Sequence, residues 1–257
     1  MDDEERLAAV GATAVTVAAC RAEESRRPNP WFVDPLADHV ARITEPSQAT
    51  TPRPGLVFWV ALRTRFLDEL LTDAVTAQGM RQVVLLGAGL DARAFRLAWP
   101  HGSTVFEIDR AAVLELKHRL TSELGMVAAC DRRSVVADVI DDDWPALLAA
   151  NGWNRDEPTC WIAEGLLVYL DPGARDAFVA KLASFGGRLG TTLTSSERAA
   201  QVELFRSGVD GQPQEWLRQL GWQATITRLG DAAESYGRPV SAKAATSAAA
   251  LLVDAHT

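Results

Sequence analysis

The chain has 257 residues, of which 47% are apolar and 23% are charged, so it is long enough to bury a large core and has the composition of a globular protein. Its 26 Lys and Arg against 34 Asp and Glu give a net charge of −8, which argues against a broad nucleic-acid-binding face. No apolar run is long enough for a membrane span, and the acidic start at residues 1–5 does not resemble a secretion leader. We therefore expect a cytoplasmic protein with no nucleic-acid and no membrane partner.

The cysteines and histidines give no sign of a metal site. The three cysteines, Cys20, Cys130 and Cys160, are far apart in the chain, and no Cys/His pair has the spacing of metal ligands. We predict three free thiols and no bound metal.

The first third of the chain has the apolar spacing of helices. Helices are predicted over residues 5–25, 35–43 and 56–78, with proline-containing segments between them. No strand is predicted before residue 81. We expect residues 1–80 to form a helical cover that packs over a sheet edge or over a ligand crevice.

After Gly79 the pattern changes to short apolar runs that are typical of buried strands. Seven strands are predicted, over residues 83–86, 103–109, 134–138, 159–164, 187–194, 223–229 and 249–254. Helical patterns lie between most of them, over residues 110–124, 142–150, 172–184 and 212–220. This alternation predicts an α/β fold with a doubly wound, seven-stranded, mostly parallel sheet. We assign residues 81–257 to this core and treat residues 1–257 as one domain.

A glycine turn follows the first predicted strand. Residues 83–86 run into Gly87, Ala88 and Gly89, and glycines allow a tight turn and the close approach of a ligand. Twenty residues later, Glu107 and Asp109 lie at the end of the second predicted strand and on the same side of it. A carboxylate at this position can accept hydrogen bonds from both hydroxyls of a ribose. Turn and acid together indicate a nucleoside-containing ligand.

Two classes of ligand fit this pair of signals. Gly87 and Gly89, followed by Ala92 and the acid, also satisfy the fingerprint of a dinucleotide site, which keeps an NAD-dependent oxidoreductase open. However, Asp138 and Glu164 end the third and fourth predicted strands, so acids follow several strands at one edge. Such an edge repels a pyrophosphate and favours a cation such as the sulfonium of S-adenosylmethionine, whose carboxylate an arginine of the N-terminal helices could bind.

Several blocks in order along the chain carry a resemblance to a known family. They are residues 21–27, 34–37, 62–68, 87–93, 106–109, 137–139 with Trp144, 164–170 and 236–239. On these blocks the chain resembles the leucine carboxyl methyltransferase-like branch of class I S-adenosylmethionine-dependent methyltransferases, which includes bacterial polyketide carboxyl methyltransferases. The resemblance spans nearly the whole sequence and implies S-adenosylmethionine as the cofactor.

The resemblance also implies roles for individual residues. It implies that Arg63 binds the cofactor carboxylate, with Arg21 as a second basic contact, and that Glu164 lies near the methionine part. It implies that the turn formed by Gly87, Ala88 and Gly89 lies against the cofactor. It also implies that Asp109 binds the ribose with Glu107 nearby, and that Asp138 and Val139 lie around the adenine. No catalytic residue is assigned.

The acceptor is inferred from what the sequence lacks. None of the histidines, His39, His101, His118 and His256, ends a predicted core strand. A phenol or alcohol usually needs a general base to become a good nucleophile, whereas a carboxylate is already ionised at neutral pH. We therefore predict an O-methyltransferase that acts on a carboxylate of a small molecule or secondary metabolite. The alternatives are the NAD-dependent oxidoreductase and a non-catalytic relative that binds the cofactor.

Overall fold

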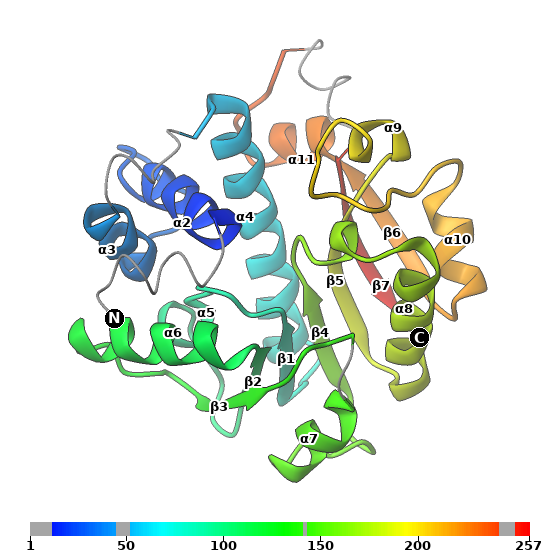
Figure 1. Cartoon of the computed structure of the whole chain (residues 1–257), viewed down its shortest axis with the longest axis horizontal. Coiled ribbons are helices and arrows are strands. Elements are labelled where there is room, and N and C mark those ends of the chain that lie inside the picture. Colours follow the sequence, from blue (N-terminus) through cyan, green and yellow to red (C-terminus); the bar gives the residue numbers. More distant parts are fainter. Residues whose placement is uncertain (1–11, 45–51, 141–142, 242–249) are drawn as a thin grey trace.

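The computed structural model describes residues 12–44, 52–140, 143–241 and 250–257, which form one seven-stranded sheet with helices on both faces (Figure 1). The strands are β1 (Gln82–Leu86), β2 (Thr104–Asp109), β3 (Asp131–Val136), β4 (Thr159–Ala163), β5 (Arg188–Thr194), β6 (Gln223–Arg228) and β7 (Ala250–His256). Their order across the sheet is β3-β2-β1-β4-β5-β7-β6, and β7 pairs antiparallel with both of its neighbours. The predicted doubly wound, mostly parallel sheet is confirmed.

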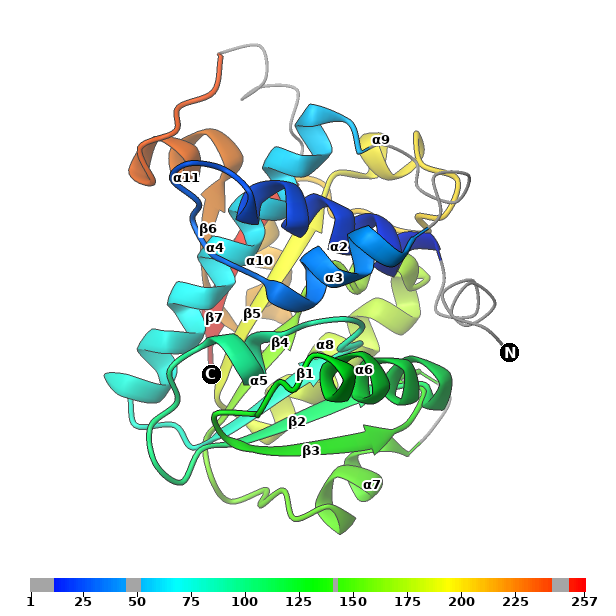
Figure 2. The same ribbon diagram turned by 90° about the vertical axis from the view of Figure 1, so that its left-hand side faces the viewer.

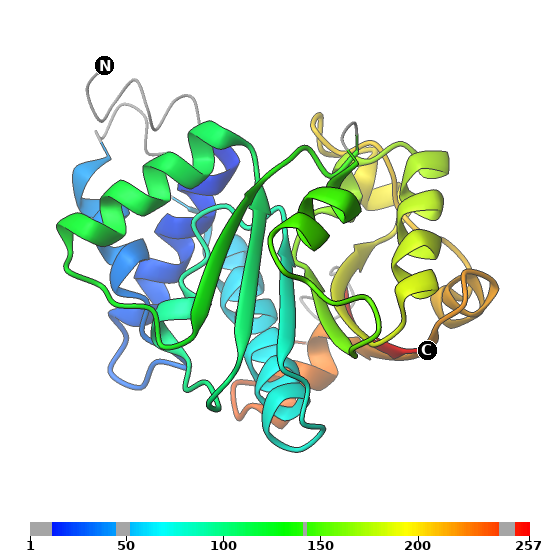
Figure 3. The same cartoon turned by 90° about the horizontal axis from the view of Figure 1, so that it is seen from below.

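Alternating side chains of the central strands bury against different helices. Val84, Leu86 and Phe106 belong to one core, together with residues of α7 (Trp144–Ala150), α8 (Pro172–Phe185) and α10 (Pro213–Gln219). Val83 and Leu85 face the other core, together with α4 (Pro54–Thr76). All five residues of β1 are buried, as expected for a central strand covered on both faces (Figure 3).

The three N-terminal helices pack against different parts of the molecule. Helices α2 (Ala12–Ser25) and α3 (Pro35–Ile43) pack on each other and on α6 (Ala111–Glu123), next to the turn that follows β1 (Figure 2). The side chain of Asp34 caps α3 by accepting a hydrogen bond from the backbone N–H of Ala37 at 2.9 Å. Helix α4 instead lies on the sheet itself, because Leu67 and Leu71 bury against β1 and β4. Only α2 and α3 therefore sit above the sheet edge.

The predicted boundaries hold best for the buried strands. β3 spans residues 131–136 and not 134–138, because this edge strand begins with charged residues that an apolar pattern does not reveal. The short helices α9 (Ser196–Ala199) and α11 (Leu229–Ser235) were not predicted. The first positions of three predicted elements, residues 5–11, 142 and 249, lie outside the described residues. No described helix is long and apolar enough to cross a membrane.

Candidate functional site

The glycine turn after β1 lies at the carboxyl edge of the sheet and is open to solvent. Gly87 is exposed and has φ of 65°, a conformation that a side chain would strain. A Cβ atom at this position would lie 3.4 Å from the side chain of Leu166, which follows β4. The turn therefore offers bare backbone beside an apolar side chain, and Ala88 beneath it is buried in the core.

Asp109 ends β2 directly beside this turn. Its Oδ2 accepts a hydrogen bond from the backbone N–H of Gly89 at 2.7 Å, and its Oδ1 accepts one from the N–H of Arg110 at 2.8 Å. The carboxylate is half-buried, and each oxygen keeps a lone pair for a further donor. The two fixed oxygens fit the pair of hydroxyls of a ribose.

Glu107 does not reach this site. Its side chain is completely buried, with Oε1 2.9 Å from Nζ of Lys117 and Oε2 2.6 Å from a terminal nitrogen of Arg132. It pairs in register with Leu85 on β1 and Ser134 on β3, inside the sheet and not at its edge. The predicted place of Glu107 near the ribose is thus not supported, because its carboxylate is enclosed in an internal ion pair.

Asp138 and Val139 lie just beyond β3 at the same edge. The backbone N–H of Ala137 donates to the carbonyl of Asp109 at 3.1 Å, which brings this segment beside the end of β2. Asp138 is half-buried, and its Oδ1 accepts from the N–H of Ile140 at 2.9 Å. Val139 packs against the core. An acid and an apolar side chain therefore lie next to Asp109.

Glu164 follows β4 and is held by arginines from three helices. Its Oε1 accepts hydrogen bonds from Arg21 of α2 and Arg63 of α4, both at 2.9 Å. Its Oε2 lies 2.7 Å from Arg93, the first residue of α5 (Arg93–Arg96). Burial by itself raises the pKa of Glu164, but the three arginines outweigh it and hold that pKa well below its usual range. Glu164 is therefore a fixed negative charge.

The charges in direct contact around Glu164 do not cancel. Arg93 also pairs with Asp91 and Asp68, and Arg96 pairs with Asp68. Four arginines thus meet three carboxylates in direct contact, and the buried carboxylate of Asp34, which interacts with Arg21 and Arg96, balances the fourth charge. An anionic group of a ligand therefore needs a guanidinium that still has free N–H groups.

Arg63 is the arginine that can bind such a group. Its Nε is used by Glu164, but its two terminal nitrogens have no acceptor among the described residues. At Gly165, which has φ of 66°, a Cβ atom would lie 3.1 Å from Nη1 of Arg63, so the missing side chain gives the guanidinium room. The planar fork of a guanidinium matches a carboxylate. The residues present fit the amino-acid end of S-adenosylmethionine, with Asp109 and its neighbours at the nucleoside end.

The edge of the sheet is less acidic than the sequence suggests. Glu107 and Glu164 are both neutralised by bound cations, so repulsion by bare carboxylates does not decide against a dinucleotide. A better reason is α5, which has four residues and whose first N–H, that of Arg93, is already bonded to the side chain of Asp91. A single turn provides little of the helix dipole and few of the free N–H groups that bind a pyrophosphate.

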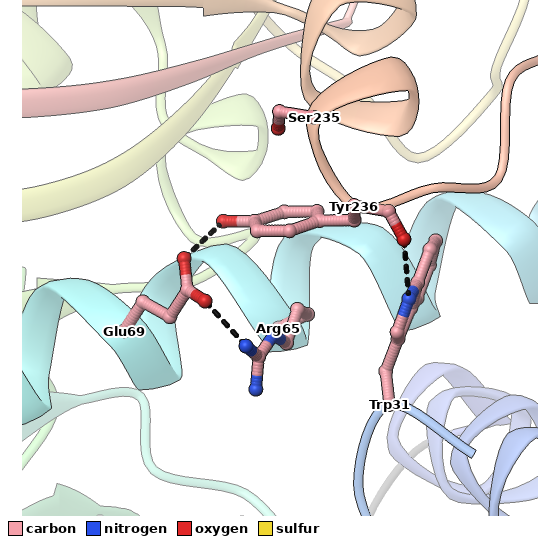
Figure 4. A pocket seen from close by; sticks show the side chains of 5 residues that line it. All are labelled: Trp31, Arg65, Glu69, Ser235 and Tyr236. Atoms are coloured by element: carbon pink, nitrogen blue, oxygen red, sulfur yellow. Dashed lines mark hydrogen bonds and ion pairs between the residues drawn. The ribbon is translucent and has the colours of Figure 1, made fainter. Parts of the chain in front are cut away.

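Two cavities in the described structure lie away from the glycine turn. One, of about 560 Å³, is lined by Trp31, Arg65, Glu69, Ser235 and Tyr236 (Figure 4). Its polar groups bond to one another, since Tyr236 donates to Glu69 at 2.7 Å and the indole of Trp31 donates to the carbonyl of Tyr236 at 3.3 Å. The other, of about 640 Å³, adjoins it along α4. The internal bonding indicates a contact between the N-terminal cover and α11.

Comparison with known proteins decides between the two ligand classes. Residues 14–183 match the leucine carboxyl methyltransferase family. The chain belongs to this family. A Streptomyces coelicolor protein named "Putative S-adenosyl-L-methionine-dependent methyltransferase" is 41% identical over 255 residues, which cover 90% of this chain and 89% of that protein. A Frankia alni protein of similar name is 40% identical and covers 90% of this chain and 88% of its own.

Solved structures support the same fold. A methyltransferase-like protein of Thermobifida fusca superimposes with a TM-score of 0.59 at 17% identity, over 93% of this chain and 94% of its own. The chain is therefore an S-adenosylmethionine-dependent methyltransferase of the leucine carboxyl methyltransferase family, and S-adenosylmethionine is its cofactor. The NAD-dependent alternative is wrong. The individual binding residues stay predictions, although the structure gathers all of them except Glu107 around the exposed edge.

Sequence reasoning gave no role in binding S-adenosylmethionine to Arg93, Asp91 or Asp68. A signal was present, because Asp68 lies on the apolar face of α4 beside Leu67 and is buried. A charged residue on such a face requires a buried partner. The sequence did not show that this partner is Arg93.

Proposed function

We propose that this methyltransferase methylates an oxygen of a small-molecule carboxylate. The observation that supports the proposal is the set of ionisable groups near the exposed edge. Among the described residues, none of these groups is suited to take a proton from a neutral hydroxyl at neutral pH. An acceptor that arrives already ionised needs no such group.

Two of the four histidines, His101 and His256, lie at the strand ends opposite the glycine turn, and the other two lie on helices α3 and α6. His256 ends the antiparallel β7 and pairs in register with Arg188, at the amino end of β5. His101 precedes β2 and is exposed. His39 of α3 faces Glu123 of α6, with 3.9 Å between Nε2 and Oε2. His118 is exposed on α6.

Other candidates for a base are held in unsuitable states. Glu164 is bound by three arginines, and its low pKa makes it a weak base. Burial raises the pKa of the thiol of Cys20 to about 11, and that of Cys160 to about 12. Tyr169 follows Glu164 and packs edge-on against the ring of Phe205, with 5.5 Å between the ring centroids. Its ring offers an apolar surface.

Apolar side chains gather near Gly87. Leu166 lies against the glycine turn, and the short 3₁₀ helix η1 (Leu167–Tyr169) follows it. The backbone N–H of Arg206 donates to the carbonyl of Val168 at 2.8 Å, so the segment that carries Phe205 is tied to η1. This surface suits an acceptor with an apolar body attached to its carboxylate.

S-Adenosylmethionine supplies an electrophilic methyl group on a positive sulfur. A carboxylate oxygen attacks that carbon while the bond from carbon to sulfur breaks, and its electron pair stays on the sulfur. No proton is transferred, so the protein has to bind and orient the two molecules and exclude water from between them.

The test uses cofactor that carries a labelled methyl group and a panel of apolar carboxylic acids, each matched with its alcohol or phenol. We expect label on the carboxylic acids, and we expect mild alkali to release it as methanol, because esters hydrolyse and ethers do not. Alkali-stable label on a hydroxyl acceptor would overturn the proposal. Cofactor binding without transfer to either panel would favour a non-catalytic relative.

A further inference from the structure

Arg93 is completely buried at the start of α5, close to the exposed glycine turn. Removing a guanidinium from water costs several kcal/mol, and a well-packed apolar side chain often stabilises a fold equally well. Stability alone is therefore a weak reason for an arginine at this position. The contacts of Arg93 indicate another reason.

The side chain of Arg93 contacts three segments that border the proposed cofactor site. Its backbone N–H donates to Oδ1 of Asp91 at 2.7 Å and its guanidinium pairs with Oδ2, which fixes the chain that follows the glycine turn. Its Nε donates to Asp68 at 2.6 Å, on the helix that carries Arg63. Its Nη1 lies 2.7 Å from Oε2 of Glu164.

The contact with Glu164 sets the direction of that carboxylate. Oε1 is shared by Arg21 of α2 and Arg63 of α4. Among the described residues, Arg93 is the ion-pair partner of Oε2, which accepts no hydrogen bond. Without it, the carboxylate is held at one oxygen only and can turn about its own axis.

We propose that Arg93 is a positioning residue for the cofactor. Its side chain keeps Glu164 and the chain after the glycine turn at a fixed distance from α4. It does not touch the cofactor itself. A lysine cannot replace it, because one ammonium group cannot bind three carboxylates in the plane that the guanidinium fork reaches. The inference rests on the cofactor site at this edge and is independent of the acceptor.

The experiment compares Arg93→Met and Arg93→Lys with a matched control, Arg188→Met. Arg188 is also nearly buried in an ion-pair network, with Asp254 of β7 and Asp73 of α4, but it lies at the amino end of β5. The dissociation constant of S-adenosylhomocysteine is measured by calorimetry, and the free energy of unfolding by urea titration.

We expect both Arg93 variants to bind S-adenosylhomocysteine about tenfold or more weakly. The control should lose stability but keep the affinity of the wild type. A structural role alone predicts that Arg93 and Arg188 variants of equal stability bind equally well.

A second readout is the dependence of affinity on pH. Glu164 loses one of its three arginines in Arg93→Met, so its pKa rises from its low value, and affinity should begin to fall at a higher pH in this variant than in the control. Wild-type affinity and a flat profile in Arg93→Lys, which retains a charge to help it fold, would overturn the proposal. If Glu164→Gln and Asp109→Asn also bind like the wild type, the cofactor site itself is misplaced.

Discussion

Glu107 and Glu164 are two buried glutamates on strands that flank β1, and both are bound by cations, yet only one of them borders a candidate site. Glu107 lies inside β2, and neither it nor Lys117 is exposed at all. Glu164 lies one residue beyond β4, and its partner Arg63 keeps two terminal nitrogens without an acceptor in the part of the chain that the structure describes. Position relative to the strand end therefore separates an acid enclosed within the fold from one that borders the candidate site.

The largest effect is expected from Glu107→Gln, which leaves Lys117 buried without its carboxylate. Removing one partner of a buried ion pair costs about 3–5 kcal/mol of stability. Cofactor affinity of the folded protein should stay unchanged, because Glu107 does not reach the exposed edge. Urea titration and calorimetry measure the two quantities. Weaker binding at unchanged stability would reverse the assignment of the two glutamates.

The second effect is expected from Arg63→Ala. Cofactor binding should weaken by about 1.5–3 kcal/mol, the range for a hydrogen bond to a charged group. Stability should change little, because Glu164 keeps Arg21 and Arg93. The control is Arg65→Ala, two residues further along α4, which removes an exposed pair with Glu69. Equal affinities of the two variants for S-adenosylhomocysteine in calorimetry would remove Arg63 from the site.

A smaller loss is expected from Asp109→Asn, about 0.5–1.5 kcal/mol of cofactor affinity. Asparagine keeps an oxygen for the N–H of Gly89, whereas alanine would also disturb the turn. The sequence predicts that Asp142→Ala leaves binding unchanged, but residue 142 lies outside the described structure. The control is therefore Asp156→Asn, at an exposed acid before β4. If both variants bind S-adenosylhomocysteine equally, Asp109 does not hold the ribose.

The parts of the fold that sequence predicts are those with a local signal. β1 and β4 are continuous apolar runs because both of their faces are covered, and such runs are visible without any knowledge of the neighbours. β3 begins with Asp131, Arg132 and Arg133, since an edge strand has fewer buried positions. Its limits therefore depend on pairing with β2, which a single sequence does not contain.

The candidate site also has one part that the sequence reveals and another part that it does not. Gly87, Gly89 and Asp109 were found because a turn and a strand end carry their own residue pattern. Whether an acid is free or neutralised depends on partners from other elements: Lys117 of α6 encloses Glu107, and helices far apart in the sequence supply the arginines of Glu164. The sequence therefore predicts more unpaired negative charge at this edge of the sheet than the structure has.

The smallest expected effect is the change with pH in the stability that Glu164 contributes. The folded-state pKa of Glu164 lies well below its usual range because the three arginines outweigh burial. A depressed pKa adds stability that is present above the pKa of the unfolded chain, about 4.3, and is lost as pH falls through the folded value. The difference in unfolding free energy between the wild type and Glu164→Gln should therefore stay constant from about pH 8 to about pH 5 and shrink only in stronger acid. Urea titrations across this range measure it. A difference that already shrinks above pH 5 would mean that the arginines do not hold Glu164 ionised. Burial would then raise the pKa of Glu164, as it does for a buried acid without a cation.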